Sequence, residues 1–320
     1  MNQRVVGALS GLIAASLWGG MYVVSDVVLD VVPPATLLLI RYAIALPVLL
    51  MAARLAHSRG IQRADWPLLA LTAFVGFGVS LLAQFAGTKL STAAAGALIT
   101  SATPAFIVLF AWLILHERAS GRQWVGLGIA SVGVLVVSLL GDQPTTEAAT
   151  NPLLGNLLLI VAAVSWALYS VLVKVNAQKY TALAITLAVT ALGIPIIAPV
   201  AAIELHTQTI GTITLPVVLG LLYIGIASTA IAFFLWNKSF ELLDAATASL
   251  FFFAQPVVGA LLSAIFLGQM LGWSFIVGGG LILLGALLGM MTPKTQVQAA
   301  GLERPAIKSP GYGKTPDQSG

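Results

Sequence analysis

Two uncharged stretches decide the fold: residues 5–24, VVGALSGLIAASLWGGMYVV, and residues 154–173, LGNLLLIVAAVSWALYSVLV. A helix needs about 20 apolar residues to cross the hydrocarbon core of a bilayer, and each stretch is long enough. Each also carries one tryptophan in its second half, Trp18 in the first and Trp166 in the second. The two stretches therefore predict membrane helices of similar character in two different parts of the chain.

Eight further apolar runs of comparable length surround these two. The full set covers residues 5–24, 35–53, 66–86, 93–115, 123–140, 154–173, 182–203, 215–236, 245–267 and 273–291. None alternates apolar and polar residues, which disfavours a membrane β-barrel. The sequence therefore predicts an all-α integral membrane protein with ten transmembrane helices.

The composition excludes several other classes of protein. Of 320 residues, 59% are hydrophobic and 8% are charged, whereas soluble domains carry roughly 25% charged residues. A soluble enzyme, a disordered protein and a nucleic-acid binder are excluded on this basis. The chain has no cysteine and three histidines, so we expect no disulfide, no metal site and no cofactor.

Basic residues alternate along the chain in a way that sets its orientation. With the amino terminus in the cytoplasm, every lysine and arginine except Lys89 and Arg41 falls in a cytoplasmic segment, and outer loops carry acids such as Asp30 and Glu204. This is the positive-inside pattern. We therefore expect a multi-pass protein of the cell (inner) membrane with both termini cytoplasmic and the lipid bilayer as its surroundings.

The two halves of the chain resemble each other. Residues 92–98, which lead to Pro104, match residues 245–250, which lead to Pro256, and residues 113–117 match 265–269. Each repeat has five spans, which is an odd number, so the second copy must enter the membrane from the opposite side. This arrangement is typical of secondary transporters. The expected divisions are a first repeat at 1–141, an outer linker at 142–153, a second repeat at 154–292 and a flexible cytoplasmic tail at 293–320.

These features together resemble the EamA-type branch of the drug/metabolite transporter superfamily. The resemblance covers about residues 5–291 and rests on Trp18, Arg41, the two prolines and the Leu-His-Glu turn that ends at Glu117. It implies a carrier of small metabolites, often an exporter, similar to the bacterial YddG-like exporters of aromatic amino acids. Gln269 departs from the pattern, because an acidic residue is common there.

Aromatic and polar residues inside the runs are the candidate substrate-binding residues. Trp18 and Tyr22 share one helix face, and Trp166 and Tyr169 lie at the matching place in the sixth run. The same residues would also suit an interfacial aromatic belt. The other candidates are Gln84, Thr100, Ser101, Tyr223, Phe233, Trp236, Asn237, Phe252 and Gln255. Pro104 and Pro256 would free the carbonyls of Thr100 and Phe252, either beside a wet cavity or at a simple packing kink.

Arg41 is the least expected residue, because it lies inside the second apolar run. A cation in the membrane normally has a partner or a function. Arg41 could bind a substrate carboxylate, extend to the outer surface, or pair with Asp26 or Asp30. We include it among the candidate substrate-binding residues and leave these alternatives open.

The sequence favours a transporter that is not driven by protons. No aspartate or glutamate lies deep in a run, and proton-coupled cation pumps generally need one. We expect export of neutral or aromatic amino acids by alternating access, through facilitated diffusion or exchange. A carrier of choline-like quaternary amines or cationic drugs is the alternative, since aromatic side chains also bind such cations.

Other classes fit less well. A membrane enzyme would need a convergent catalytic set, and the short turn with His116, Glu117 and Arg118 offers only boundary charges. A channel would need a filter or a charged ring. We expect a small-molecule substrate and no nucleic acid as partners. Gly285 and Gly289 have the spacing of helix-packing motifs, which predicts close helix packing or a homodimer contact; otherwise we expect a monomer.

Overall fold

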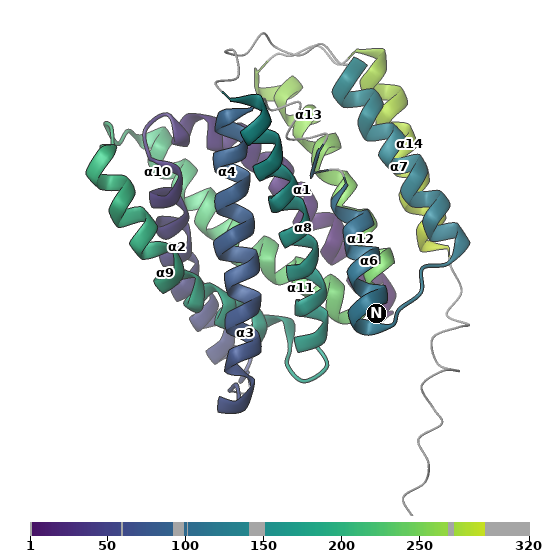
Figure 1. The fold of residues 1–320 in the computed structure, drawn as a ribbon, viewed down its shortest axis with the longest axis horizontal. Helices are drawn as coiled ribbons and strands as arrows, with labels where there is room; N and C mark the ends of the chain where they lie inside the picture. The colour runs from purple at the N-terminus through teal and green to yellow at the C-terminus, as the bar shows by residue number, and fades with distance from the viewer. Residues whose placement is uncertain are drawn as a thin grey trace, which may run out of the picture.

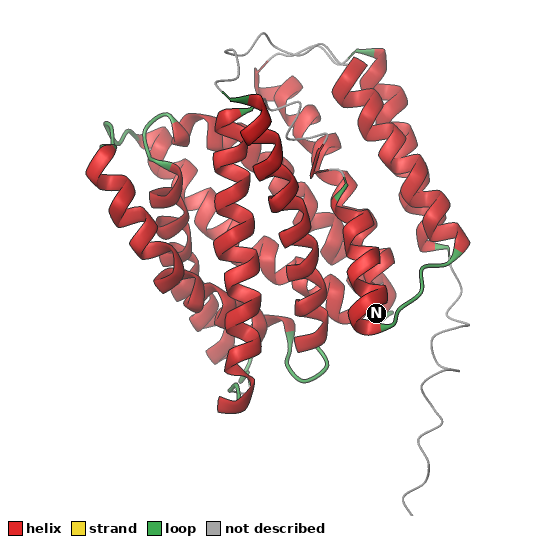
Figure 2. Cartoon of the chain, in the orientation of Figure 1, coloured by secondary structure: helices red, strands yellow, loops and turns green. Residues whose placement is uncertain are grey.

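The computed structural model describes residues 2–58, 60–91, 99–100, 102–140, 151–267 and 272–291. These residues are almost entirely helical, and they contain no strand (Figure 2). The all-α prediction is therefore confirmed for this part of the chain. Ser101 and the predicted tail at 293–320 lie outside the described residues.

The helices follow the predicted runs closely. In the first half they are α1 (Gln3–Leu29), α2 (Pro34–Leu55), η1 (Arg63–Asp65), α3 (Trp66–Ala73), η2 (Phe74–Ser80), α4 (Leu81–Leu90), α6 (Thr103–Leu115) and α7 (Gly121–Leu140). In the second half they are α8 (Pro152–Asn176), α9 (Ala182–Thr207), α10 (Leu215–Leu222), η3 (Tyr223–Ile231), α11 (Ala232–Leu242), α12 (Ala245–Leu250), η4 (Phe251–Phe253), α13 (Ala254–Leu267) and α14 (Trp273–Met290). The segments η2 and η3 are π-helices that continue directly into their neighbours.

The described helices are those of a multi-pass membrane protein. Six are long and apolar enough to cross a membrane, namely Gln3–Met21, Pro34–Leu55, Arg63–Thr88, Pro152–Asn176, Ala182–Thr207 and Leu215–Leu242. Four shorter apolar helices, Thr103–Leu115, Gly121–Val136, Ala245–Gly259 and Trp273–Gly289, accompany them. The number ten for the spans thus remains a prediction.

Polar residues define where several helices begin. The side chains of Asn151, Thr181 and Asp244 accept hydrogen bonds from the first-turn amides of α8, α9 and α12, which satisfies donors that have no partner within the helix. At α2 the cap comes from another helix, because Glu204 of α9 accepts from the backbone N–H groups of Ala35 and Thr36 at 3.1 and 2.8 Å.

The two prolines of the matched segments lie near helix starts. Pro104 occupies the first turn of α6, where its missing N–H costs no hydrogen bond. Pro256 is the third residue of α13, directly after the 3₁₀ turn η4. Residues 99–100 are helical and α6 begins at Thr103, one residue before Pro104, so the expected kink at Pro104 remains a prediction.

Four sets of contacts hold the helices together. The helix α1 packs against α11 and α13, α8 packs against α4 and α6, α2 packs against α9, and α7 packs against α14. In Figure 1, α1 and α8 lie in the middle of the molecule, and α7 and α14 lie side by side at one edge. The main apolar cluster lies in the middle and includes Trp18, Phe77, Trp166 and Phe233.

The α7–α14 contact is built on glycine. A Cβ atom on Gly126 would lie 2.5 Å from the carbonyl oxygen of Gly285, and one on Gly285 would lie 2.4 Å from the carbonyl oxygen of Gly126. No side chain fits between backbones this close. The prediction that Gly285 and Gly289 allow close helix packing is thus confirmed, whereas a homodimer contact remains a prediction.

Candidate functional site

A small central cavity lies where α1, α2, α4, α6, α8, α11 and α13 meet. Its volume is about 40 Å³, and the residues that line it are Trp18, Met21, Arg41, Ser80, Leu81, Gln84, Thr100, Thr103, Ala162, Ala163, Trp166, Phe233, Phe252 and Gln255. Both halves of the chain contribute to its wall.

Tightly packed aromatic rings form one wall of the central cavity. The ring of Trp18 lies 5.4 Å from those of Trp166 and Phe233, and the ring of Trp166 lies 5.6 Å from that of Phe233, centroid to centroid. The indole N–H of Trp18 donates to the carbonyl of Ser228 at 3.0 Å, which fixes the orientation of the Trp18 ring. The wall is therefore rigid and mostly apolar.

Arg41 places a positive charge at this wall. Its Nε donates to the hydroxyl of Thr229 at 2.7 Å, its Nη2 lies 3.4 Å from both oxygens of Ser228, and its Cζ lies 5.6 Å from the centroid of the Phe233 ring. The side chain is 1% exposed. Within the described residues it forms no ion pair, so extension to the surface and pairing with Asp30 are both wrong. The side chain of Asp26 is not described.

Eight predicted binding residues meet at the central cavity: Trp18, Arg41, Gln84, Thr100, Trp166, Phe233, Phe252 and Gln255. Thr100 and Phe252 are the two residues four positions before the matched prolines. The helix that carries Tyr22 is described but the side chain of Tyr22 is not, and Ser101 lies outside the described residues.

Four predicted binding residues lie elsewhere and join helices to one another. The hydroxyl of Tyr169 donates to Asn237 at 3.0 Å, and the indole N–H of Trp236 donates to Ser170 at 3.1 Å. The hydroxyl of Tyr223 donates to the carbonyl of Leu17 at 2.8 Å. None of these four is among the residues that line the cavity.

Six residues that line the central cavity were not among the predicted binding residues: Met21, Ser80, Leu81, Thr103, Ala162 and Ala163. Helical periodicity could have found the two alanines, because they lie four and three positions before Trp166 and share its face. Ser80 is harder to find, because it ends the π-helix η2 and its orientation depends on that irregular turn.

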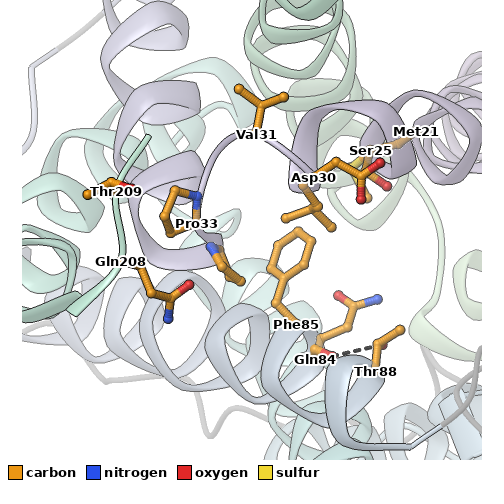
Figure 3. A pocket seen from close by; sticks show the side chains of 12 residues that line it. Met21, Ser25, Asp30, Val31, Pro33, Gln84, Phe85, Thr88, Gln208 and Thr209 are labelled. Carbon is orange, nitrogen blue, oxygen red and sulfur yellow. Dashed lines mark hydrogen bonds between the residues drawn. The ribbon is translucent and has the colours of Figure 1, made fainter. Parts of the chain in front are cut away.

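A larger hollow, which we call the vestibule, opens beside the end of α1. It measures about 360 Å³ and is lined by Met21, Ser25, Leu29, Asp30, Val31, Pro33, Pro34, Gln84, Phe85, Thr88, Gln208 and Thr209. Figure 3 shows Gln84 and Phe85 of α4 across the vestibule from Ser25 and Asp30 of the α1 end. Met21 and Gln84 line both the vestibule and the central cavity, so the two spaces adjoin.

On the opposite side, where α1 begins, polar contacts join several helices, and we call it the amino-terminal side. Lys174 of α8 forms an ion pair with Glu117 at 3.3 Å, and Glu117 also accepts from the backbone N–H of Ala245 at 2.9 Å. The amide of Gln123 donates to Asp244 at 2.7 Å and to Thr247 at 3.0 Å. These contacts link α6, α7, α8 and α12 below the aromatic wall.

An exposed cluster near this side joins η1 to the α8–α9 turn. Lys179 donates to Asp65 at 2.8 Å and the hydroxyl of Tyr180 donates to Asp65 at 2.5 Å. Hydrogen bonds from Lys179 and Tyr180 lower the pKa of Asp65, because they stabilise its charged form. Among the described residues, no group of histidine or acidic side chains could hold a metal ion.

The fold and the site define a multi-pass helical membrane protein with a central cavity that adjoins a larger vestibule. The EamA-like transporter family matches residues 5–139 and again residues 153–291. The chain therefore belongs to the EamA-like transporter family and is a membrane transporter, a class that generally does not act as an enzyme.

Individual relatives agree with this assignment. The chain is 25% identical over 289 residues to the uncharacterized transporter YetK of Bacillus subtilis, covering 87% of this chain and 86% of that protein. It is 27% identical over 287 residues to an uncharacterized transporter of Archaeoglobus fulgidus, and the match covers 89% of this chain and 97% of that protein. A crystal structure of a protein 24% identical to this chain superposes with a TM-score of 0.75 and covers 88% and 95% of the two chains, which supports the fold.

Proposed function

We propose that this transporter moves small amphipathic metabolites, most favourably neutral or aromatic amino acids, out of the cell by alternating access. The observation that carries the proposal is the central cavity, which both halves line and which adjoins the vestibule. A carrier needs a site that opens to one side at a time. We propose that the structure represents the state with the vestibule open and the amino-terminal side closed.

We further propose ten spans arranged as two inverted five-helix repeats, with the divisions expected from the sequence. The packing supports this arrangement, because the first span (α1) contacts the eighth and ninth, and the sixth (α8) contacts the third and fourth. Each half also carries a π-helix in its third span, η2 and η3. The family matches each half separately.

The orientation is part of the same proposal. The basic residues Arg4, Arg54, Arg122 and Lys174 lie at the ends of α1, α2, α7 and α8 that face the amino-terminal side. Positive charges accumulate on the cytoplasmic side of membrane proteins. We therefore propose that the amino-terminal side faces the cytoplasm and that the protein resides in the cell membrane, with the vestibule outside.

The charge at the cavity favours amino acids over quaternary amines. Arg41 lines the cavity and is buried, and a fixed cation repels another cation strongly where water is excluded. The aromatic wall of Trp18, Trp166 and Phe233 would suit a choline-like ligand in the absence of that charge. Choline-like amines and cationic drugs therefore remain the second candidate.

Proton coupling has no evident group to carry it. The described acidic side chains, such as Asp30, Glu117, Glu204 and Asp244, lie at helix ends or in turns rather than at the cavity. We therefore propose that the substrate gradient drives transport, by facilitated diffusion or exchange.

The test is uptake into vesicles reconstituted with the full chain. Labelled phenylalanine, leucine, choline and a cationic dye are supplied separately, each with and without an imposed proton gradient. We expect amino acid uptake that does not depend on the proton gradient and that is lost in Trp18→Ala. Uptake of choline alone would replace the amino acid proposal, and dye uptake that requires the proton gradient would overturn the argument from missing carboxylates.

A further inference from the structure

Three residues that line the central cavity carry buried polar atoms without a hydrogen-bond partner. In the described part of the chain, the buried side-chain atoms without a hydrogen-bond partner are Arg41 Nη1, Ser58 Oγ, Thr103 Oγ1, Trp166 Nε1, Thr190 Oγ1 and Ser239 Oγ. Three of these six, on Arg41, Thr103 and Trp166, belong to residues that line the cavity. Buried polar atoms are nearly always paired, so three at one cavity are groups that a polar ligand could satisfy.

The chemistry of the three groups specifies that ligand. A guanidinium nitrogen and an indole nitrogen can only donate, and a threonine hydroxyl can donate or accept. Arg41 forms no ion pair among the described residues, so its charge is uncompensated there. The ligand must therefore accept hydrogen bonds and carry negative charge, which a carboxylate does in the geometry that arginine binds best.

Arg41 is already held in place to bind such a group. Its Nε is bound to Thr229 at 2.7 Å and its Nη2 lies 3.4 Å from the Ser228 oxygens, which leaves Nη1 as the free end. A side chain that is fixed beforehand loses little further conformational entropy when it binds a ligand.

The volumes indicate how a substrate would lie. The central cavity measures about 40 Å³ and the adjoining vestibule about 360 Å³, so the larger part of a substrate would lie in the vestibule. A carboxylate at Arg41 would therefore direct the rest of its molecule past Gln84 and Met21, which line both spaces.

We propose that Arg41 Nη1, Trp166 Nε1 and Thr103 Oγ1 form the subsite for the carboxylate of the transported substrate, whose remainder points into the vestibule. This rests on the proposed function and sharpens it. Recognition depends on the carboxylate, so an organic acid without an amino group binds, whereas an amine without a carboxylate does not.

Three probes that share a phenyl group on a two-carbon chain separate the charges. L-phenylalanine has both charged groups, 3-phenylpropionate has only the carboxylate, and phenethylamine has only the ammonium. Binding to the purified full chain in detergent is measured by calorimetry and by the shift in thermal unfolding, in a carboxylate-free methanesulfonate buffer with and without chloride. We expect the first two probes to bind at least tenfold more tightly than phenethylamine.

Other outcomes overturn the subsite. Phenethylamine binding as tightly as 3-phenylpropionate would do so, as would binding of neither carboxylate. Chloride stabilising the protein where 3-phenylpropionate does not would assign the three groups to an inorganic anion instead.

Variants that remove single polar atoms test the assignment residue by residue. Thr103→Val and Trp166→Phe each remove one hydrogen-bonding group and keep most of the volume, and each should weaken 3-phenylpropionate binding about tenfold. Arg41→Gln should weaken 3-phenylpropionate binding about 100-fold, and Arg41→Lys, which keeps the positive charge, should weaken this binding less. The matched control is Thr190→Val, which removes an unpartnered hydroxyl that does not line the cavity.

Failure of the subsite differs from failure of the transport proposal. If Thr103→Val and Trp166→Phe fold and bind 3-phenylpropionate as the parent protein does, the subsite is wrong even where amino acids are transported. If the probes bind as expected but no amino acid crosses the vesicle membrane, the subsite remains and the transport proposal fails.

Discussion

Single side chains explain how the central cavity holds its shape. The indole of Trp18 and the guanidinium of Arg41 both lie within 3.4 Å of the carbonyl oxygen of Ser228. That carbonyl lies in the π-helix η3, whose wider turn leaves backbone oxygens free to accept from side chains. One irregular turn thus orients two residues of the proposed site.

At the surface, Asp65 gives the protein a measurable pH dependence. Its pKa is lowered because the charged form accepts hydrogen bonds from Lys179 and Tyr180. The contribution to stability is therefore fully present above the unfolded-state pKa of about 3.9 and is lost as the pH falls through the lowered folded-state value. We expect the parent protein to unfold at a higher temperature than Asp65→Asn at pH 7, with the difference shrinking below about pH 4.

Thermal unfolding followed by tryptophan fluorescence between pH 3 and pH 7 measures this difference. Asp30→Asn is the control, because Asp30 lines the vestibule and no ion pair is found for it among the described residues. A difference between Asp65→Asn and the parent protein that stays constant over this pH range would refute the assignment.

At the scale of elements, two kinds of contact hold the helices: close backbone packing and polar links at helix ends. The α7–α14 pair depends on the first, through Gly126 and Gly285. The amino-terminal side shows the second, through Glu117 and Lys174. The first kind is expected to be permanent and the second to break during transport.

Gly126→Ala should destabilise the α7–α14 pair. The added methyl group would lie 2.5 Å from the Gly285 carbonyl oxygen, so the helices must separate, at a cost of about 1–3 kcal/mol. Gly128→Ala is the control on the same helix, because a Cβ atom there meets nothing within 4 Å. Thermal unfolding in detergent compares the two variants, and equal stabilities would contradict the glycine contact.

Glu117→Gln should loosen the amino-terminal side. It removes the ion pair with Lys174. A loss of about 1 kcal/mol changes the ratio of molecules with this side closed to molecules with this side open about fivefold. A cysteine placed at Leu81, which lines the central cavity, should then react faster with a thiol reagent supplied from that side. The control is Lys238→Gln, which breaks an ion pair within α11 alone; equal acceleration by both variants would show that the link is not specific.

At the scale of the whole molecule, the proposed orientation places the vestibule outside the cell and the amino-terminal side in the cytoplasm. The chain has no cysteine, so single cysteines can be labelled without background. Gln178→Cys lies in the exposed α8–α9 turn and Thr212→Cys in the exposed α9–α10 loop. In spheroplasts, an impermeant maleimide should label Thr212→Cys directly and Gln178→Cys only after permeabilisation, and the reverse pattern would invert the proposed orientation.

Much of this architecture can be predicted from the sequence, because the thickness of the membrane sets the length of the apolar runs and its two sides differ in the charges they attract. The predicted runs lie close to the observed helices, and Trp18, Trp166 and Phe233 meet as residues of one cavity. The roles of Tyr169, Trp236 and Asn237 were harder to predict, because the same residue types suit a cavity wall and a hydrogen-bonded helix contact.

The sequence names a substrate carboxylate among the possible partners of Arg41 but cannot choose between them, for a related reason. The sequence shows a cation in an apolar run, but not whether it extends to the surface or stays buried. That outcome depends on Thr229 and Ser228, which lie far along the chain and reach Arg41 only through the turn of η3. Residues that act across the two halves are beyond what local sequence patterns determine.

Counterflow is the most direct test of the central claim that the two halves alternate around one site. Vesicles containing the full chain are loaded with unlabelled phenylalanine, and the entry of labelled phenylalanine is followed with no ion gradient. With internal phenylalanine present, we expect the labelled phenylalanine to enter faster and to accumulate transiently inside the vesicles. Trp166→Ala should abolish this effect. Entry of the label at the same rate with and without internal phenylalanine would contradict alternating access.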